Sequence, residues 1–272
     1  TRRTVAFKQL KSVLRNTVPR ETLQHELLLQ ASVSASEFVA TILGAIDDAS
    51  GELGFGLVRD GVNVLAPSAE MPSVLIPLAI PPISLSATQF HPQFMEFAHF
   101  GDLYQFLRDT SRNLTWAERL ELFLDASLGV RALHEHHPRS IIHSDLKSSN
   151  FLAVDAGDGH VVLKITDFGL ASTAKSSSSS HMSSRTGVGT SNYKAPEVYE
   201  EHYQPIPASD IWSLGMVFYE IVTGKVPYDG LTELQVMKKV DAKELPNMDL
   251  IPADALKGLT VLIEYVCNFE PD

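Results

Sequence analysis

Four polar side chains between residues 143 and 167 have types and spacing suited to phosphoryl transfer. Asp145, Lys147 and Asn150 share the run His-Ser-Asp-Leu-Lys-Ser-Ser-Asn, and Asp167 follows Asn150 by seventeen residues. Moving a phosphoryl group to a hydroxyl needs a carboxylate near that hydroxyl, oxygen ligands for magnesium, and positive charge beside the phosphates. Asp145 is the candidate for accepting or orienting the hydroxyl proton. Lys147 is the candidate for neutralising charge on the transferring group.

The candidate metal ligands follow from the chemistry of magnesium. This hard cation prefers oxygen and retains water, so one carboxylate and one amide oxygen suffice beside a nucleotide's phosphates. Asn150 and Asp167 supply these two oxygens. His143 has no second histidine near it at a metal-ligand spacing, and we predict a packing role for it.

Two further motifs complete a recognisable series. Asp167-Phe168-Gly169 comes first and Ala195-Pro196-Glu197 follows it. Each alone is most often a turn or a surface loop. In this order and at these spacings, they make the chain resemble a eukaryotic protein kinase. In that family His143 packs against the residue that is Phe168 here.

The resemblance implies a fold and a domain division. The fold would be α+β and two-lobed, with a small β-rich N-lobe and a larger, mainly helical C-lobe. We predict one kinase domain over 1–272, divided into a partial N-lobe at 1–94, a hinge at 95–100 and a partial C-lobe at 101–272. Both ends look trimmed, because no glycine-rich loop precedes Lys8 and the chain stops short of the family's arginine partner for Glu197. The pair Gly54-x-Gly56 is predicted to be a turn.

The N-lobe nucleotide residues are assigned through the resemblance. Val5-Ala6-Phe7-Lys8 is similar to the strand whose lysine holds the α and β phosphates of ATP. Glu26, in a helical stretch predicted over 21–32, is the expected ion-pair partner of Lys8. Family members carry an apolar residue four positions after this glutamate, where this chain has Gln30. Either the register shifts by a residue or an internal hydrophobic column is partly polar.

The hinge is predicted from an extended strand that ends at Met95. By resemblance, Met95 is the gatekeeper at the back of the adenine pocket, and backbone groups of Glu96 and Ala98 bond the adenine ring. Leu152 is expected to contact the nucleotide as well. The next helix is predicted to begin at Gly101-Asp102-Leu103.

Helix signals and a further anchoring residue mark the C-lobe. Thr115 and Glu118 form a Thr-x-x-Glu capping box at the start of an amphipathic helix. We predict that its large apolar residues are core: Leu120, Leu122, Phe123, Leu124, Leu128 and Leu133. By resemblance, Asp210 ties down the backbone of the catalytic loop. Cys267 is predicted to be a small buried hydrophobe.

Composition agrees with this reading. A chain of 272 residues with 44% hydrophobic content can bury a substantial core, and its net charge of −11 argues against nonspecific nucleic-acid binding. One cysteine and no visible secretory signal favour a reducing setting, and we expect a cytoplasmic location. The uncharged stretch Met71 to Phe90 is broken by prolines, so we expect a loop and no membrane segment. Part of 44–94 is treated as an insertion.

The region between Asp167 and Glu197 has two possible readings. Five serines at 176–180 predict either a flexible polar loop or an autophosphorylated activation loop. Thr190, shortly before Tyr193, resembles the substrate-side platform and would contact Asp145 and Lys147.

Two features of the run from His143 to Asn150 shape the functional prediction. Ser144 stands where many kinases place an arginine that receives an activation-loop phosphate, so we expect activity to be uncoupled from loop phosphorylation. By resemblance, Lys147-Ser148-Ser149 is the serine/threonine form of the loop, and the chain as a whole is similar to serine/threonine kinases of the tyrosine-kinase-like group. We predict transfer from ATP, with Mg²⁺, to protein serine and threonine hydroxyls. The alternative is a pseudokinase or scaffold, while the Ala-Pro-Glu motif disfavours a small-molecule kinase.

Overall fold

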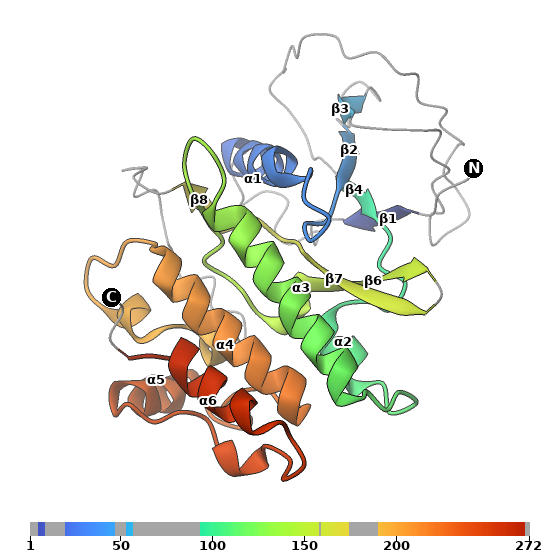
Figure 1. Ribbon diagram of the computed structural model, residues 1–272. Coiled ribbons are helices and arrows are strands. Elements are labelled where there is room, and N and C mark those ends of the chain that lie inside the picture. The colour runs from blue at the N-terminus through green and yellow to red at the C-terminus, as the bar shows by residue number, and fades with distance from the viewer. Residues whose placement is uncertain are drawn as a thin grey trace.

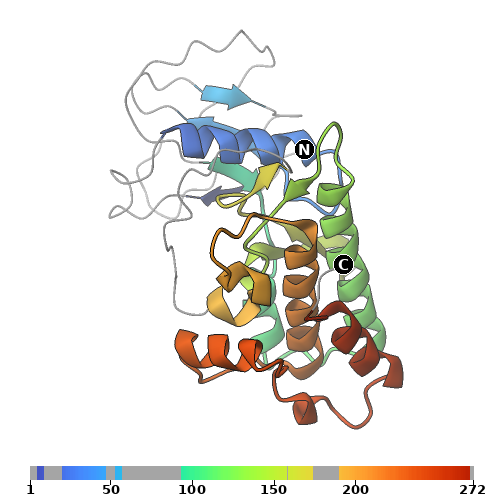
Figure 2. The same ribbon diagram turned by 90° about the vertical axis from the view of Figure 1, so that its left-hand side faces the viewer.

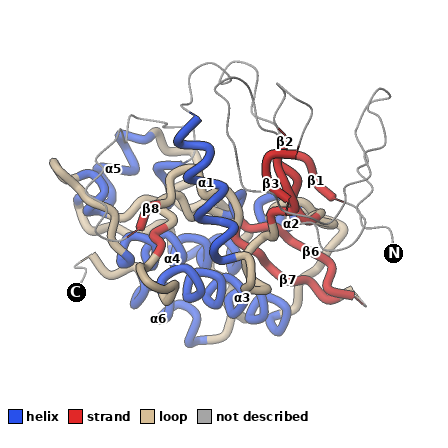
Figure 3. Tube along the Cα trace, turned by 90° about the horizontal axis from the view of Figure 1, so that it is seen from above, coloured by secondary structure: helices blue, strands red, loops and turns tan. Residues whose placement is uncertain are grey.

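The protein has an α+β, two-lobed architecture (Figure 1). The computed structural model describes residues 5–8, 20–46, 53–56, 93–157, 159–173 and 190–269. Viewed from the side, the sheet of the smaller lobe lies at one end and helices α4, α5 and α6 at the other (Figure 2). Seen from above, β1, β2 and β3 gather on the side of the molecule opposite α4 to α6 (Figure 3).

The small lobe is built on an antiparallel sheet with strand order β1-β4-β2-β3. Its strands are β1 (Val5–Lys8), β2 (Ile42–Ile46), β3 (Leu53–Gly56) and β4 (Gln93–Glu96). The register pairs Lys8 with Gln93 and Ala6 with Met95. The prediction of a turn at Gly54-x-Gly56 was wrong, because this segment pairs with β2 as a strand. Of the proposed insertion, residues 47–52 and 57–92 lie outside the described residues, as does the proline-containing stretch.

Helix α1 (Arg20–Val33) crosses beside this sheet and carries a partly polar buried face. Glu26, Leu29, Gln30 and Val33 are all buried, at the three- and four-residue spacing of one helix face. Leu28 points to the opposite side and is exposed. The predicted helix over 21–32 is therefore confirmed.

The larger lobe is mainly helical. Its helices are α2 (Leu103–Arg108), α3 (Trp116–His134), α4 (Pro207–Thr223), α5 (Glu233–Asp241) and α6 (Lys257–Val266). Short 3-10 turns lie at Ser148–Asn150, Thr190–Tyr193, Pro196–Tyr199 and Met248–Leu250. The capping box of Thr115 and Glu118 is present, and Asp102 caps α2 by accepting from the backbone of Gln105.

Helix α4 is the centre of this lobe. Pro207 occupies its first turn, and Gly224 ends it with a left-handed backbone (φ 67°), which glycine adopts without strain. Thirteen of its seventeen residues are buried, the pattern of a helix surrounded by protein on all sides. Cys267 packs against it, and burial raises the pKa of the Cys267 thiol to about 12, as expected for an inert buried residue.

The expectation that every leucine of α3 is core was wrong for two positions. Leu122, Phe123 and Leu133 are buried and Leu128 is half-buried, whereas Leu120 and Leu124 are 40% and 57% exposed. Those two line an open apolar groove between α3, α4 and α6. Helix α3 packs against α4 on one face and against β7 on another. Leu120 and Leu124 lie on a further face, which the described residues cover only in part.

Two further antiparallel strand pairs lie outside the sheet of the small lobe. Strands β6 (Phe151–Gly157) and β7 (His160–Ile165) form a hairpin, and β5 (Ile141–Ile142) pairs with β8 (Ser172–Thr173). Ile165 bonds both Phe38 and Ala40 of the small lobe through its backbone. No helix in the described part of the chain combines the length and apolarity needed to cross a membrane.

Candidate active site

The loop from His143 to Asn150, here called the catalytic loop, is anchored by Asp210 of α4. The buried Asp210 carboxylate accepts the backbone N–H of His143 at 2.8 Å and that of Ser144 at 2.9 Å. It also contacts His134 Nε2 at 3.0 Å. This confirms the prediction that Asp210 ties down the loop backbone.

His143 is a packing residue with two satisfied ring nitrogens. Its ring is fully buried and meets Phe168 edge-on, with centroids 5.3 Å apart. Nδ1 accepts the Asp145 N–H at 3.3 Å, so Nε2 carries the proton and donates to the Thr166 carbonyl at 3.0 Å. The predicted contact with Phe168 is therefore confirmed, and the ring connects the catalytic loop to the segment before Asp167.

Asp145, Lys147 and Asn150 converge at one point. Lys147 Nζ lies 2.6 Å from Asp145 Oδ2. Asn150 Nδ2 donates to the Asp145 carbonyl at 2.7 Å and to Oδ2 at 3.2 Å. Asp145 Oδ1 is buried and has no hydrogen-bond partner among the described residues. Lys147 and Asn150 thus hold Asp145 Oδ2 and leave Oδ1 for an external donor.

Asp167 sits on a strained backbone beside α1. Its φ of 66° is left-handed, a conformation that costs a non-glycine residue about 1–3 kcal/mol and that clusters at functional sites. A β-carbon placed on the neighbouring Gly169 would lie 3.4 Å from Asp167 Oδ1 and 3.5 Å from Glu26 Oε2. The carboxylates of Glu26 and Asp167 therefore both face Gly169.

The small-lobe residues predicted to bind the nucleotide are only partly described. Lys8 ends β1, and its side chain lies outside the described residues, so its ion pair with Glu26 stays a prediction. Gln30 is fully buried and its Nε2 donates to the Ala40 carbonyl at 2.8 Å. Its burial on the same face as Glu26 favours a partly polar internal column over a shifted register.

The predicted hinge joins β4 to α2. Met95 lies in β4 opposite Ala6 and Ile42, and its side chain is not described. Glu96 accepts the Thr41 N–H at 2.9 Å and pairs with Lys164 at 2.8 Å, so its side chain is committed to interlobe contacts. Ala98 accepts from Gly101, and Leu152 of β6 lies opposite Lys164 in the hairpin.

The segment between Asp167 and Glu197 is described only at its two ends. The serine run at 176–180 lies outside the described residues. Thr190 begins a 3-10 turn, and its side chain is not described. The predicted contact of Thr190 with Asp145 and Lys147 therefore stays a prediction.

The donor set matches a magnesium ion bound together with a polyphosphate. Because Asn150 uses its amide nitrogen toward Asp145, the Oδ1 atom is the one suited to bind a cation. The described residues contain no cluster of three or more histidine, cysteine or acidic side chains able to hold a metal by themselves. Asn150 Oδ1 and the Asp167 carboxylate are oxygen donors of the kind that magnesium prefers, so the chemistry of the two residues fits this ion.

Sequence reasoning missed a buried polar network next to this cluster. Tyr193 contacts both Ser148 and Glu220, and Glu220 pairs with Arg108. These residues come from four separate elements, so no local spacing could have grouped them. The only sequence signal was a glutamate within the otherwise apolar run of α4.

Comparison with known families agrees with the geometry. A family model described as a protein kinase domain matches residues 82–269, more than half of the chain. Residues before 82, which include Lys8 and Glu26, fall outside that match.

Individual relatives give the same picture. The chain is 37% identical over 150 residues to a probable serine/threonine-protein kinase, drkD, of Dictyostelium discoideum, covering 55% of this chain and 11% of that protein. It is 34% identical over 180 residues to drkC of the same organism, covering 65% and 22%. The serine/threonine-protein kinase BRI1-like 2 of Arabidopsis thaliana matches at 34% over 171 residues, covering 60% and 14%. The chain thus spans less than a quarter of each of these relatives.

Proposed function

The chain belongs to the protein kinase family, and we propose that it transfers the γ-phosphoryl group of ATP to serine and threonine hydroxyls of proteins. The observation that carries this proposal is the hydrogen bonding of the two Asp145 carboxylate oxygens. One of its oxygens is held by Lys147 and Asn150, and the other is buried without a partner among the described residues. A buried acceptor atom of this kind suits an incoming hydroxyl donor.

Each residue of the cluster has a distinct part in this proposal. Asp145 Oδ1 accepts the hydroxyl hydrogen and orients the oxygen toward the phosphorus. Lys147, held at 2.6 Å from Asp145 Oδ2, supplies positive charge where the phosphoryl group passes. Asn150 keeps the Asp145 carboxylate in one orientation through its Nδ2. Positioned proton transfer of this kind contributes roughly 10²–10⁴-fold to rate.

Asn150 Oδ1 and the Asp167 carboxylate would hold magnesium. The ion, when bound, neutralises phosphate charge and fixes the geometry of the polyphosphate. Lys8, paired with Glu26, would hold the α and β phosphates. The hinge backbone at Glu96 and Ala98, with Met95 behind and Leu152 beside the ring, would hold adenine.

The finer classification is part of the proposal. The Lys147-Ser148-Ser149 sequence supports serine/threonine specificity, and the overall resemblance supports the tyrosine-kinase-like group. The names of the relatives support the same specificity. A single cysteine, buried at position 267, supports action in a reducing compartment such as the cytoplasm. The net charge of −11 disfavours nucleic acid as a partner.

The test is transfer of radiolabelled phosphate from ATP to myelin basic protein and to the chain itself, followed by phosphoamino-acid analysis. Label on serine or threonine is the expected result. Label on tyrosine would overturn the specificity. Magnesium-dependent binding of ATP without any transfer would identify a pseudokinase instead.

A further inference from the structure

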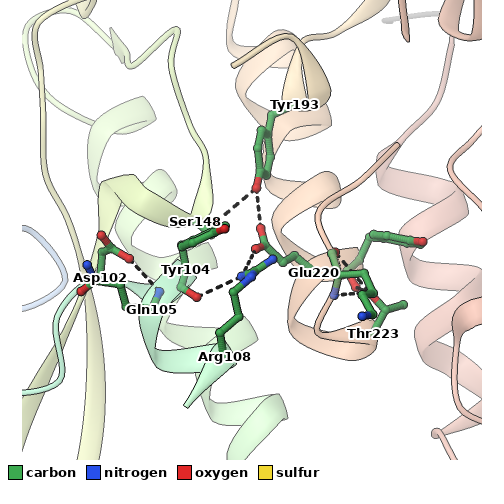
Figure 4. Close-up of polar contacts among 10 residues, drawn as sticks. Asp102, Tyr104, Gln105, Arg108, Ser148, Tyr193, Glu220 and Thr223 are labelled. Carbon is green, nitrogen blue, oxygen red and sulfur yellow. Dashed lines mark hydrogen bonds and ion pairs between the residues drawn. The ribbon is translucent and has the colours of Figure 1, made fainter. Parts of the chain in front are cut away.

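Lys194 is the one residue of the segment 191–195 that is not buried. The structure describes all five residues of this segment, and the other four are buried. The Tyr193 side chain points toward Ser148 of the catalytic loop, with 3.2 Å between the Tyr193 hydroxyl and Ser148 Oγ (Figure 4). Lys194 therefore directly follows a residue that contacts the loop carrying Asp145.

The backbone beside Lys194 is held in place by buried hydrogen bonds. Asn192 Nδ2 donates to the Pro227 carbonyl at 2.7 Å, and the Ser213 hydroxyl of α4 donates to the Tyr193 carbonyl at 2.8 Å. Because these bonds fix the main chain, the ammonium group of Lys194 is confined to the space that its own side chain can reach. A basic group is thus presented at a defined place beside the candidate site.

Lys194 forms a long ion pair with Glu233 of α5. Its Nζ lies 4.0 Å from Glu233 Oε1, and the two side chains are 24% and 46% exposed. A partly exposed pair of this kind contributes about 0–1 kcal/mol to stability. Glu233 is the first residue of α5, where the positive end of the helix dipole stabilises a carboxylate. Lys194 can therefore exchange Glu233 for another carboxylate at little cost.

An acidic side chain is the group that suits this position. Lysine presents a compact ammonium group with three donors and no acceptor, so an anionic oxygen is a favourable partner. The net charge of −11 repels acidic proteins at long range, but physiological salt screens this repulsion beyond about 8 Å. Direct contact with Lys194 then decides whether a carboxylate near the acceptor hydroxyl is favoured.

We propose that Lys194 is a specificity-determining residue that binds an acidic side chain of the acceptor protein, close to the serine or threonine that is phosphorylated. The acceptor carboxylate takes the place of Glu233. An extended chain advances about 3.3 Å per residue, and Lys194 adjoins the residue that contacts the catalytic loop, so the acidic residue lies within about three positions of the acceptor. The inference rests on the proposed kinase activity and names the class of acceptor that it favours.

The experiment uses serine peptides as probes. One peptide is neutral, and in each of the others a single glutamate occupies one of the three positions before or after the serine. The quantity compared is the ratio of kcat/KM for each glutamate peptide to kcat/KM for the neutral peptide. This ratio cancels any change in the chemical step, which the two peptides share.

Five proteins are made as the full 272-residue chain: wild type, Lys194→Gln, Lys194→Arg, Glu233→Gln and Lys257→Gln. Lys257→Gln is the matched control, since it removes an exposed lysine at the start of α6. Melting temperatures are measured for all five proteins.

Wild type should favour at least one glutamate position by threefold or more, the size expected of one partly exposed ion pair. Lys194→Gln should bring that ratio close to one, and Lys194→Arg should keep it because the positive charge remains. Glu233→Gln should raise the ratio above the wild-type value, because it removes the competing carboxylate. Lys257→Gln should match wild type.

Three outcomes would overturn the inference. No glutamate position could reach threefold in wild type, Lys194→Gln could retain the wild-type ratio, or Glu233→Gln could fail to raise it, which would mean that the pair of Lys194 and Glu233 only braces α5. If Lys194→Gln fails to fold, Glu233→Gln decides alone, since it leaves Lys194 in place. A wild-type chain that labels neither these peptides nor myelin basic protein would instead refute the proposed kinase activity.

Discussion

Asp210 Oδ1 accepts a 2.9 Å hydrogen bond from the backbone of Ser144, a non-glycine residue held at φ 65°. A left-handed backbone at such a residue costs about 1–3 kcal/mol and persists only where the surroundings impose it. Here the surroundings are a buried carboxylate on α4, which also accepts from His143. The catalytic loop is thus shaped by a residue more than sixty positions away in the sequence.

Asp210→Ala should both destabilise the protein and slow transfer. The change leaves two loop N–H groups without acceptors, at about 1–3 kcal/mol each. We expect the free energy of unfolding to fall by roughly 2–4 kcal/mol and turnover to fall at least tenfold. Urea unfolding and initial rates check both effects. The control is Asp229→Ala, which removes an exposed carboxylate after α4 and should change neither the free energy of unfolding nor turnover. Equal losses in the two variants would show that Asp210 does not anchor the loop.

Gly215→Ala should destabilise the packing of α4 on α6. A β-carbon at Gly215 would lie 2.5 Å from Cys267 Sγ and 2.6 Å from a Val266 methyl, too close for either to remain in place. Overpacking of this kind costs typically about 1–3 kcal/mol. Gly258→Ala on α6 is the control, since nothing lies within 4 Å of its β-carbon. Thermal unfolding should show a lower midpoint for the first variant only.

Magnesium binding should depend on the Asp167 carboxylate. We expect Asp167→Asn, which keeps the side-chain shape and tolerates a left-handed backbone, to weaken ATP binding with magnesium and leave magnesium-free binding nearly unchanged. Asp167→Ala should behave similarly. Calorimetry with and without the metal separates the two quantities. Equal losses in both titrations would mean that Asp167 only shapes its loop.

The fold and the convergence of Asp145, Lys147 and Asn150 were predictable because their signals are local. Thr115 and Glu118 indicated a helix start, and the run from His143 to Asn150 placed three candidate side chains within eight residues. The exposure of Leu120 and Leu124 was not predictable, since α3 has apolar residues on more faces than its neighbours cover. Arg108, Glu220 and Tyr193 meet only in the folded chain, as does Lys164 with Glu96.

Activity should not depend strongly on phosphorylation of the serine-rich loop. Ser144 cannot supply the paired, charged donors with which an arginine docks a phosphate. The Ser144 Oγ atom is also buried without a partner among the described residues. The test compares untreated protein, phosphatase-treated protein, and a variant with alanine at Ser176 to Ser180, Ser183, Ser184 and Thr186. Ser172 and Thr173 are kept, because they form β8. A fall above about tenfold, or roughly 1.4 kcal/mol in the barrier, would contradict the uncoupling.

The most direct test of the central claim is the transfer rate of Asp145→Asn set against its affinity for ATP. Asparagine keeps the shape of the side chain but cannot accept a proton at the position of Oδ1, so turnover should fall by roughly 10²–10⁴-fold. ATP affinity should stay within threefold, since Asp145 contacts Lys147 and Asn150 and is not assigned to the nucleotide. Asp155→Asn, an exposed carboxylate on β6, should retain wild-type rates. A turnover of Asp145→Asn within threefold of wild type would remove Asp145 from the mechanism and contradict the account.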